Sequence, residues 1–111
     1  WISSHVTRAA LNWVINEGGH PEYATVARVR LAGVELDAKD ANKAKAAIDA
    51  IDPAQAQMPL VLDRRGDVLL ALGDVEGARK CWEDALERDR ASGELLALLS
   101  LKIQALPEKK S

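Results

Sequence analysis

The 111-residue sequence lacks phenylalanine, and it has only three tryptophans and one tyrosine to fill a core. Hydrophobic residues still make up 48% of the chain. Alanine and leucine, which favour helices, supply most of them, and runs of β-branched residues are missing. We therefore expect an all-α fold in which small and aliphatic side chains make the contacts between helices.

The chain also lacks a second cysteine, an excess of basic residues and a long apolar run. Since Cys81 is the only cysteine, no disulfide forms within the chain, but a lone thiol suits a reducing or an oxidising compartment and does not fix the location. The net charge of −2, with no basic stripe, argues against nucleic-acid binding. No run reaches the length of about 18 apolar residues that spans a membrane.

Small, apolar and capping residues recur every 34 positions along the chain. The recurring residues are Ala10, Ala44 and Ala78, Val34 and Val68, Leu36 and Leu70, and Asp40 and Asp74. In a helical chain, a period of about 34 residues is the signature of tetratricopeptide repeats, which stack helix pairs into a solenoid. The sequence therefore predicts a tetratricopeptide-repeat-like α-solenoid, with residues 1–111 as a single domain.

Capping and breaking residues divide this solenoid into about six antiparallel helices, of which the last is a C-terminal cap. Serine and aspartate favour helix N-termini, proline suits the first helical position, and glycine ends helices. The predicted helices begin at Ser3 or Ser4, Pro21, Asp40, Pro59, Asp74 and Ser92. They are expected to end at Gly18 and Gly19, near Ala38, at Asp52, at Leu72, near Arg88 and before Pro107. Residues 54–58 are expected to be the loosest connection.

The best copy of the repeat centres on Gly66, Ala78 and Trp82. Glycine inside a helix costs roughly 0.5–1 kcal/mol relative to alanine, so Gly66 indicates that a neighbouring helix crosses closely there. Ala78 is small for the same reason, and Trp82 is expected to be the large core side chain of the pair. Cys81, next to it, is interpreted as a buried structural thiol.

The first helix of each pair lines the concave groove of a repeat stack, which makes this groove one candidate protein-binding site. The candidate groove residues are Val29, Gly33, Leu36, Asp63, Asp67 and Leu70. The set is apolar and acidic, and its two aspartates argue against a grip on the terminal carboxylate of a peptide. A packed or solvated surface is the alternative interpretation.

The last helix holds more leucine than a cap needs, which makes it a second candidate site. The packing stripe is expected to contain Leu96, Leu99, Ser100 and Ile103, whereas Leu95, Leu98, Leu101 and Leu106 lie off that stripe. The candidate apolar patch, Leu95, Leu98 and Leu101, would indicate a protein partner or a homodimer if exposed. The alternative is that the helix sits deep or is covered by neighbours.

Support for catalysis is thin. His5 and His20 are far apart in sequence, no cluster has metal-ligand spacing, and no glycine-rich loop is present to hold phosphate. The adjacent Glu83 and Asp84 point in different directions on a helix. We expect no enzyme activity, no metal and no cofactor.

Longer strings carry a family resemblance. The stretches ARVRLAGVEL, RGDVLLALGDVEGARKCW and the Leu101-Lys102-Ile103 ending resemble the C-terminal part of the YfgM family, the ancillary subunits of the bacterial Sec translocon. The resemblance covers roughly Tyr23 to Leu106.

The resemblance implies a fragment of a longer protein, with a transmembrane anchor ahead of Trp1 and a repeat domain on the periplasmic side of the inner membrane. It also implies protein partners: the SecYEG channel, a PpiD-like chaperone and exported clients. Two other interpretations remain open, a generic cytoplasmic repeat scaffold and an accessory domain of a larger enzyme.

Overall fold

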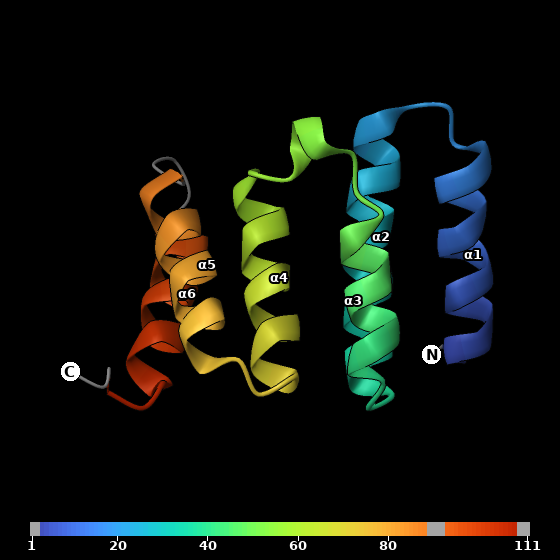
Figure 1. The fold of residues 1–111 in the computed structure, drawn as a ribbon. Helices are drawn as coiled ribbons and strands as arrows, with labels where there is room; N and C mark the ends of the chain where they lie inside the picture. The colour runs from blue at the N-terminus through green and yellow to red at the C-terminus, as the bar shows by residue number, and fades with distance from the viewer. Residues whose placement is uncertain (1–2, 89–92, 109–111) are drawn as a thin grey trace.

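The computed structural model describes residues 3–88 and 93–108, and these residues form six α-helices and one short 3-10 helix, without a strand among them. The elements are α1 (Ser4–Glu17), α2 (Pro21–Asp37), α3 (Ala41–Asp49), η1 (Pro53–Gln55), α4 (Pro59–Ala71), α5 (Val75–Arg88) and α6 (Gly93–Ala105) (Figure 1). The predicted all-α class is confirmed. The predicted cap Ser92 lies outside the described residues.

The helices stand side by side in an elongated stack of 46 × 29 × 27 Å, with α1 at one end and α5 and α6 at the other (Figure 1). Short turns join α2 to α3 and α4 to α5, so each of these pairs is antiparallel. The first helices of the repeat units are α2, α4 and α6, and the second helices are α1, α3 and α5.

Side-chain caps begin three of the helices as predicted. The side chains of Ser3, Asp40 and Asp74 accept hydrogen bonds from the backbone N–H groups of residues 6, 43 and 77, at 3.3, 3.0 and 2.8 Å. The end of α3 differs from the prediction, because this helix stops at Asp49 and Ile51 is buried beyond it. The expected loose connection overlaps η1, which the Asp52 carboxylate caps by accepting from the N–H of Ala54 at 2.9 Å.

Left-handed backbone marks the turns within the helix pairs. Lys39 has φ of 64° and Gly73, at the matching place of the next repeat, has φ of 88°. A side chain is disfavoured in this conformation, so Lys39 occupies a position that suits glycine. At the end of α1, Gly19 with φ of 82° adopts the left-handed conformation, whereas the C-cap residue Gly18 stays right-handed.

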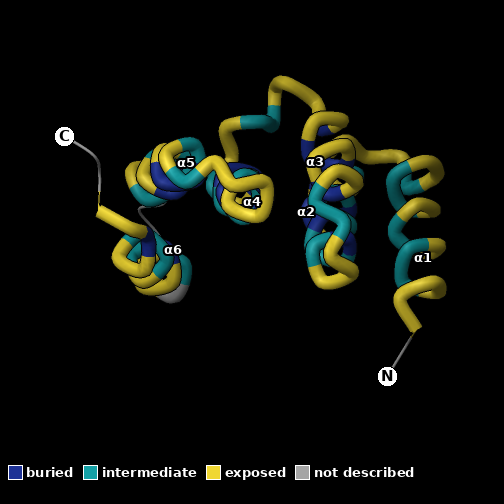
Figure 2. Tube along the Cα trace, turned by 60° about the horizontal axis from the view of Figure 1, so that its bottom comes forward, coloured by how far each residue is buried: buried dark blue, intermediate teal, exposed yellow. Residues whose placement is uncertain are grey.

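Three consecutive helices build each of the two hydrophobic cores, whose buried faces are dark blue in Figure 2. Core I takes side chains from α2, α3, the segment that follows α3, and α4; they are Val29, Ala32, Ala44, Ala47, Ile48, Ile51, Val61 and Val68. Core II takes side chains from α4, α5 and α6 with the residue after it; they are Leu62, Ala78, Trp82, Ala85, Leu99 and Leu106. Helix α4 therefore contributes to both cores. It closes core I against α2 and α3, and it is the first helix of the unit that builds core II with α5.

The predicted close crossing of α4 and α5 is confirmed. A Cβ atom added at Gly66 would overlap the indole ring of Trp82, and Ala78 and Trp82 are buried. The Trp82 Nε1–H also donates to the backbone oxygen of Asp63 at 2.9 Å, which ties the two helices together. Cys81, expected to be a buried structural thiol, is only half-buried and is not among the side chains of core II.

The stripe predicted for α6 is right in part, because Leu99 lies in core II and Ile103 packs against it. Leu95 packs against core II and Leu106 lies in it, although the spacing places both off the stripe. Leu96, which the spacing places on the stripe, is 46% exposed. The reason is that α6 buries the side that faces α5, and no following helix among the described residues covers the side that holds Leu96.

Candidate protein-interaction surface

The structure separates the six candidate groove residues, although all lie on first helices. Val29 is buried in core I, so it belongs to the core rather than to a groove. Gly33 lies under the guanidinium of Arg64, at whose atoms an added Cβ would stand 3.0–3.4 Å away. The prediction that Val29 and Gly33 line an open groove is therefore wrong, because the core buries Val29 and the Arg64 side chain covers Gly33.

Arg64 is the residue that covers this part of α2. Its Nε donates to the backbone oxygen of Val29 at 3.1 Å, and its Nη1 bonds an Asp67 carboxylate oxygen at 3.1 Å. The small Gly33 leaves room for the planar guanidinium to lie across α2. Sequence reasoning missed this role, because nothing in the spacing of a single arginine shows which neighbouring helix it reaches.

The two candidate aspartates hold a lysine from α6. The Lys102 Nζ bonds Asp63 at 2.7 Å and Asp67 at 2.9 Å, and it lies 5.5 Å from the centre of a Trp82 ring. Burial raises the pKa of Asp67, against the opposing hydrogen bond from Lys102. Burial would lower the pKa of Lys102, but the hydrogen bonds that its ammonium donates to Asp63 and Asp67, together with the charges of these two carboxylates, outweigh burial and raise that pKa.

These ion pairs correct the charge argument about the groove. With Lys102 and Arg64 beside them, Asp63 and Asp67 form a nearly balanced cluster rather than a bare acidic patch. Repulsion by the two aspartates therefore gives no reason to exclude an anionic ligand group. The cluster works as a latch between α4 and α6, and we call Asp63, Asp67 and Lys102 the latch.

Three of the candidates do come together, in a hollow between α2, α3 and α4. The hollow has a volume of about 370 Å³ and is lined by Leu36, Lys39, Ala41, Asp67, Leu70 and Ala71. Leu70 is 41% exposed, and the lining of the hollow is mostly apolar, with the ammonium of Lys39 and the carboxylate of Asp67 among the lining groups. Such a hollow suits an apolar side chain of a partner with a polar group beside it.

Two leucines of α6 lie on the equivalent face of the next first helix. Leu98 and Leu101 are 45% and 62% exposed, and they stand 34 residues after Arg64 and Asp67. Leu95, the third member of the predicted patch, packs against core II instead. We call the hollow together with Leu98 and Leu101 the first-helix face.

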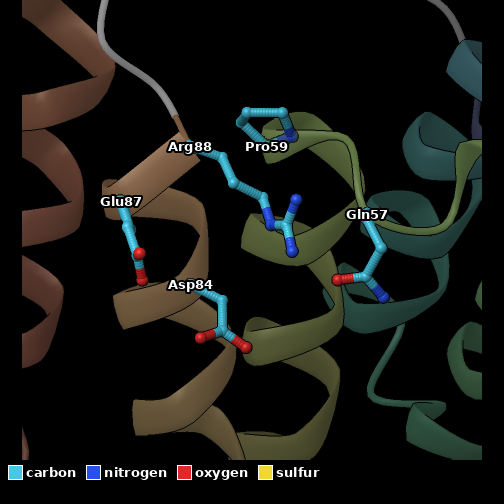
Figure 3. A pocket seen from close by; sticks show the side chains of 5 residues that line it. All are labelled: Gln57, Pro59, Asp84, Glu87 and Arg88. Carbon is cyan, nitrogen blue, oxygen red and sulfur yellow. The ribbon is translucent and has the colours of Figure 1, made fainter.

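A second hollow, of about 480 Å³, lies between the start of α4 and the end of α5 (Figure 3). It is lined by Gln57, Pro59, Asp84, Glu87 and Arg88, and Figure 3 shows the Arg88 side chain reaching toward Gln57 and Pro59. Asp84 pairs with Lys80 at 3.5 Å. The mixed charges give no single-sign field for a ligand, and sequence reasoning pointed to none of these residues as a site.

The remaining chemistry of the described residues is sparse. Burial raises the pKa of the half-buried Cys81 thiol, so it is a weak nucleophile at neutral pH. Among residues 3–88 and 93–108, no three acidic, histidine or cysteine side chains gather closely enough to hold a metal ion. In the same described ranges, no helix has both the length and the apolar character to cross a bilayer.

Comparison with known proteins fits this repeat architecture. Residues 4–108 match the model of the tetratricopeptide repeat-like domain, so the chain belongs to this family, and the predicted repeat class is confirmed. A curated relative, described as the ancillary SecYEG translocon subunit of Escherichia coli (strain K12), is 35% identical over 81 residues. The match covers 73% of this chain and 38% of the relative, so the chain spans about two fifths of the relative's length. No solved structure matches.

Proposed function

We propose that the chain is the repeat domain of an ancillary subunit of a bacterial protein-export channel and that it acts by binding proteins, without catalysis. Support comes from the 35% identity to an ancillary translocon subunit and from membership of a repeat family whose stacks present binding surfaces. The single observation that carries the proposal is the first-helix face, where an apolar hollow and two exposed leucines continue across successive first helices.

The proposed function includes protein partners and a cellular location. The SecYEG channel, a PpiD-like chaperone and exported clients bind the first-helix face on the periplasmic side of the inner membrane. An anchor outside residues 1–111 holds the domain at the membrane. Exposed leucines beside a balanced charge cluster suit partners with apolar side chains and a polar rim.

A binding titration with purified SecYEG in nanodiscs tests the proposal. Leu70→Lys places a charge in the hollow, and the double change Leu98→Lys with Leu101→Lys does so on α6; each is expected to weaken binding at least tenfold. Glu83→Lys is the control, since Glu83 is exposed on α5 outside the first-helix face.

The controls make the outcomes distinct. Circular dichroism is expected to show unchanged folding in all these variants, since the three replaced leucines are 41–62% exposed and Glu83 is exposed. Unfolding of the double variant would assign Leu98 and Leu101 to the core. No binding by the unaltered chain, or equal weakening by Glu83→Lys, would contradict the proposal and favour a generic repeat scaffold or an enzyme accessory domain.

A further inference from the structure

The hollow of the first-helix face lies inside the stack rather than at one of its ends. It is built by α2, α3 and α4, with α1 packed on α2 and α5 packed on α4. The turn from α2 to α3 and the C-terminal end of α4 meet on the same side of the stack (Figure 1). Two small residues of the lining, Ala41 and Ala71, leave space beside Leu36 and Leu70.

The size and lining of this hollow suit one apolar side chain. Its volume of about 370 Å³ is at the lower end of the range of about 300–1,000 Å³ for ligand pockets. A helix, with a diameter of about 10 Å, does not enter such a space, whereas a side chain from an extended segment does. Leu36 packs against core I, so the core fixes one wall, and Leu70 supplies an exposed wall that a ligand covers.

Lys39 supplies the charge of the hollow that is left for a ligand. The carboxylate of Asp67 is already engaged, because Arg64 and Lys102 lie 3.1 and 2.9 Å from its two oxygens. By contrast, the ammonium of Lys39 forms no ion pair with the residues that the structure describes. The hollow therefore combines apolar walls with one available positive charge.

The backbone of Lys39 is unfavourable for a residue with a side chain. Its φ of 64° lies in the left-handed region, and the matching place of the next repeat is taken by Gly73 with φ of 88°. Non-glycine residues in this conformation cluster at binding and active sites. The acidic neighbours of Lys39 are engaged elsewhere, since Asp40 caps α3 and Asp37 lines a separate hollow beside α1. Lys39 thus brings a free charge to the hollow against a backbone preference.

We propose that the hollow binds an extended segment of the partner protein in which a large apolar residue lies next to a glutamate or an aspartate. The apolar side chain fills the hollow against Leu36 and Leu70, and the neighbouring carboxylate pairs with the Lys39 ammonium. This specificity rests on the proposed function, because the hollow is part of the first-helix face. The ligand group is an acidic side chain rather than a chain terminus, since one flexible ammonium is a point charge and not the nest of N–H groups that captures a terminal carboxylate.

Binding of short peptides, followed by the NMR signals of leucine methyl groups, tests this specificity. The peptides have both ends blocked and carry leucine at alternate positions, with glutamate, glutamine or lysine between the leucines. The glutamate peptide is expected to bind about two- to fivefold more tightly than the glutamine peptide, as an exposed ion pair allows, and the lysine peptide is expected to bind most weakly. The methyl signals of Leu36 and Leu70 are expected to shift on binding.

Variants of the chain separate the charge of Lys39 from its effect on the fold. Lys39→Gln is expected to make the glutamate and glutamine peptides bind equally, which completes a double-mutant cycle. Lys39→Gly is expected to lose the same preference although it relieves the backbone and stabilises the domain, so unfolding is not the reason for the loss. Lys80→Gln is the matched control, because the Lys80 side chain is 78% exposed on α5, outside the first-helix face, and it is expected to keep the preference.

Ala71→Leu tests the apolar part of the site without a change in charge. The larger side chain fills the hollow from an exposed position on α4, so it is expected to weaken the binding of all three peptides. Circular dichroism checks that the variant is folded. Unchanged binding by a folded Ala71→Leu would overturn the hollow as the site of the apolar side chain.

The outcomes also separate this specificity from the proposed function. Binding to SecYEG nanodiscs together with peptide binding that shows no preference for glutamate would leave the proposed function standing and overturn the specificity. A glutamate preference that depends on Lys39, without binding to SecYEG, would support the specificity and exclude the channel as the partner. A preference for the lysine peptide, tighter binding by a peptide with a free C-terminus, or no methyl shift with any peptide at millimolar concentration would each overturn the proposal.

Discussion

At the residue scale, a few positions decide how closely the helices approach. Gly66 and Trp82 fit each other across α4 and α5, and Ala44 and Ala78 are fully buried where a first helix packs on a second. The 34-residue spacing alone identifies the two alanines. The spacing is informative because every repeat must solve the same packing problem at the same place.

Gly66→Ala is expected to destabilise the domain by about 1–3 kcal/mol, because the added methyl group overlaps the Trp82 indole and forces one of the helices to shift. This exceeds the gain of roughly 1 kcal/mol that alanine brings to a helix interior. Urea denaturation measures the change. Gly93→Ala, whose methyl group meets nothing nearby, is expected to stay within about 0.5 kcal/mol, and a neutral Gly66→Ala would contradict the close crossing.

Trp82→Ala is expected to cost about 3–5 kcal/mol, since it empties the centre of core II. Trp82→Phe keeps most of the ring but removes the bond to the Asp63 oxygen, at a cost of about 1 kcal/mol for the hydrogen bond. Thermal and urea unfolding of both variants separate packing from hydrogen bonding. A loss below about 1 kcal/mol for Trp82→Ala would mean that this side chain is not core.

Lys39→Gly is expected to stabilise the chain by about 1 kcal/mol, because Lys39 adopts φ of 64° and a side chain is disfavoured there. Gly73→Lys, the reverse change at the matching turn, is expected to destabilise it by a similar amount. Equilibrium unfolding measures both. If both substitutions changed the free energy of unfolding by the same amount in the same direction, the two turns would differ in conformation.

At the scale of the helix, the sequence predicts where helices begin better than it predicts which side of α6 is buried. Caps at Ser3, Asp40 and Asp74 fix where helices begin, so those starts are predictable. The orientation of α6 is not, because a helix with leucines on several sides can bury any of them. What selects the buried side is the contact with α5 and the latch to α4, and neither is visible in the spacing.

The latch is expected to contribute about 1–2 kcal/mol through its hydrogen bonds to a charged group. The raised pKa of Lys102 means that this contribution is complete below the ordinary lysine pKa of 10.5 and is lost as the pH rises through the higher pKa of the folded state. Lys102→Met removes it at every pH. The difference in unfolding free energy between the two proteins is therefore expected to be full at about pH 8 and to shrink in strong alkali.

Lys102→Arg is the control for this titration, since arginine keeps its charge throughout. A difference between the unaltered chain and Lys102→Met that stayed constant with pH would show that Lys102 acts by packing on Trp82 alone. In acid, the pKa of Asp67 matters instead. Burial raises this pKa and so favours the neutral carboxyl in the folded state, which means that protonating Asp67 does not by itself destabilise the fold.

At the scale of the whole molecule, three-helix cores repeat along one axis and leave the first helices to form a continuous face. The repeat class and the acidic positions of this face could be predicted from the sequence, whereas the covering of Val29 and Gly33 by Arg64 could not. Ion pairs between helices depend on long flexible side chains, and their partners follow from the folded arrangement rather than from a period. The hollow that Leu70 lines is the part of the predicted groove that the fold leaves open.

Site-specific photo-crosslinking in membranes that contain the export channel tests the central claim most directly. A photoreactive side chain is placed at position 70, in the hollow, or at position 83, on the exposed outer side of α5. We predict crosslinks to channel or chaperone subunits from position 70 and none from position 83. Crosslinks of equal strength from both positions, or to none of these proteins from position 70, would contradict a binding role for the first-helix face.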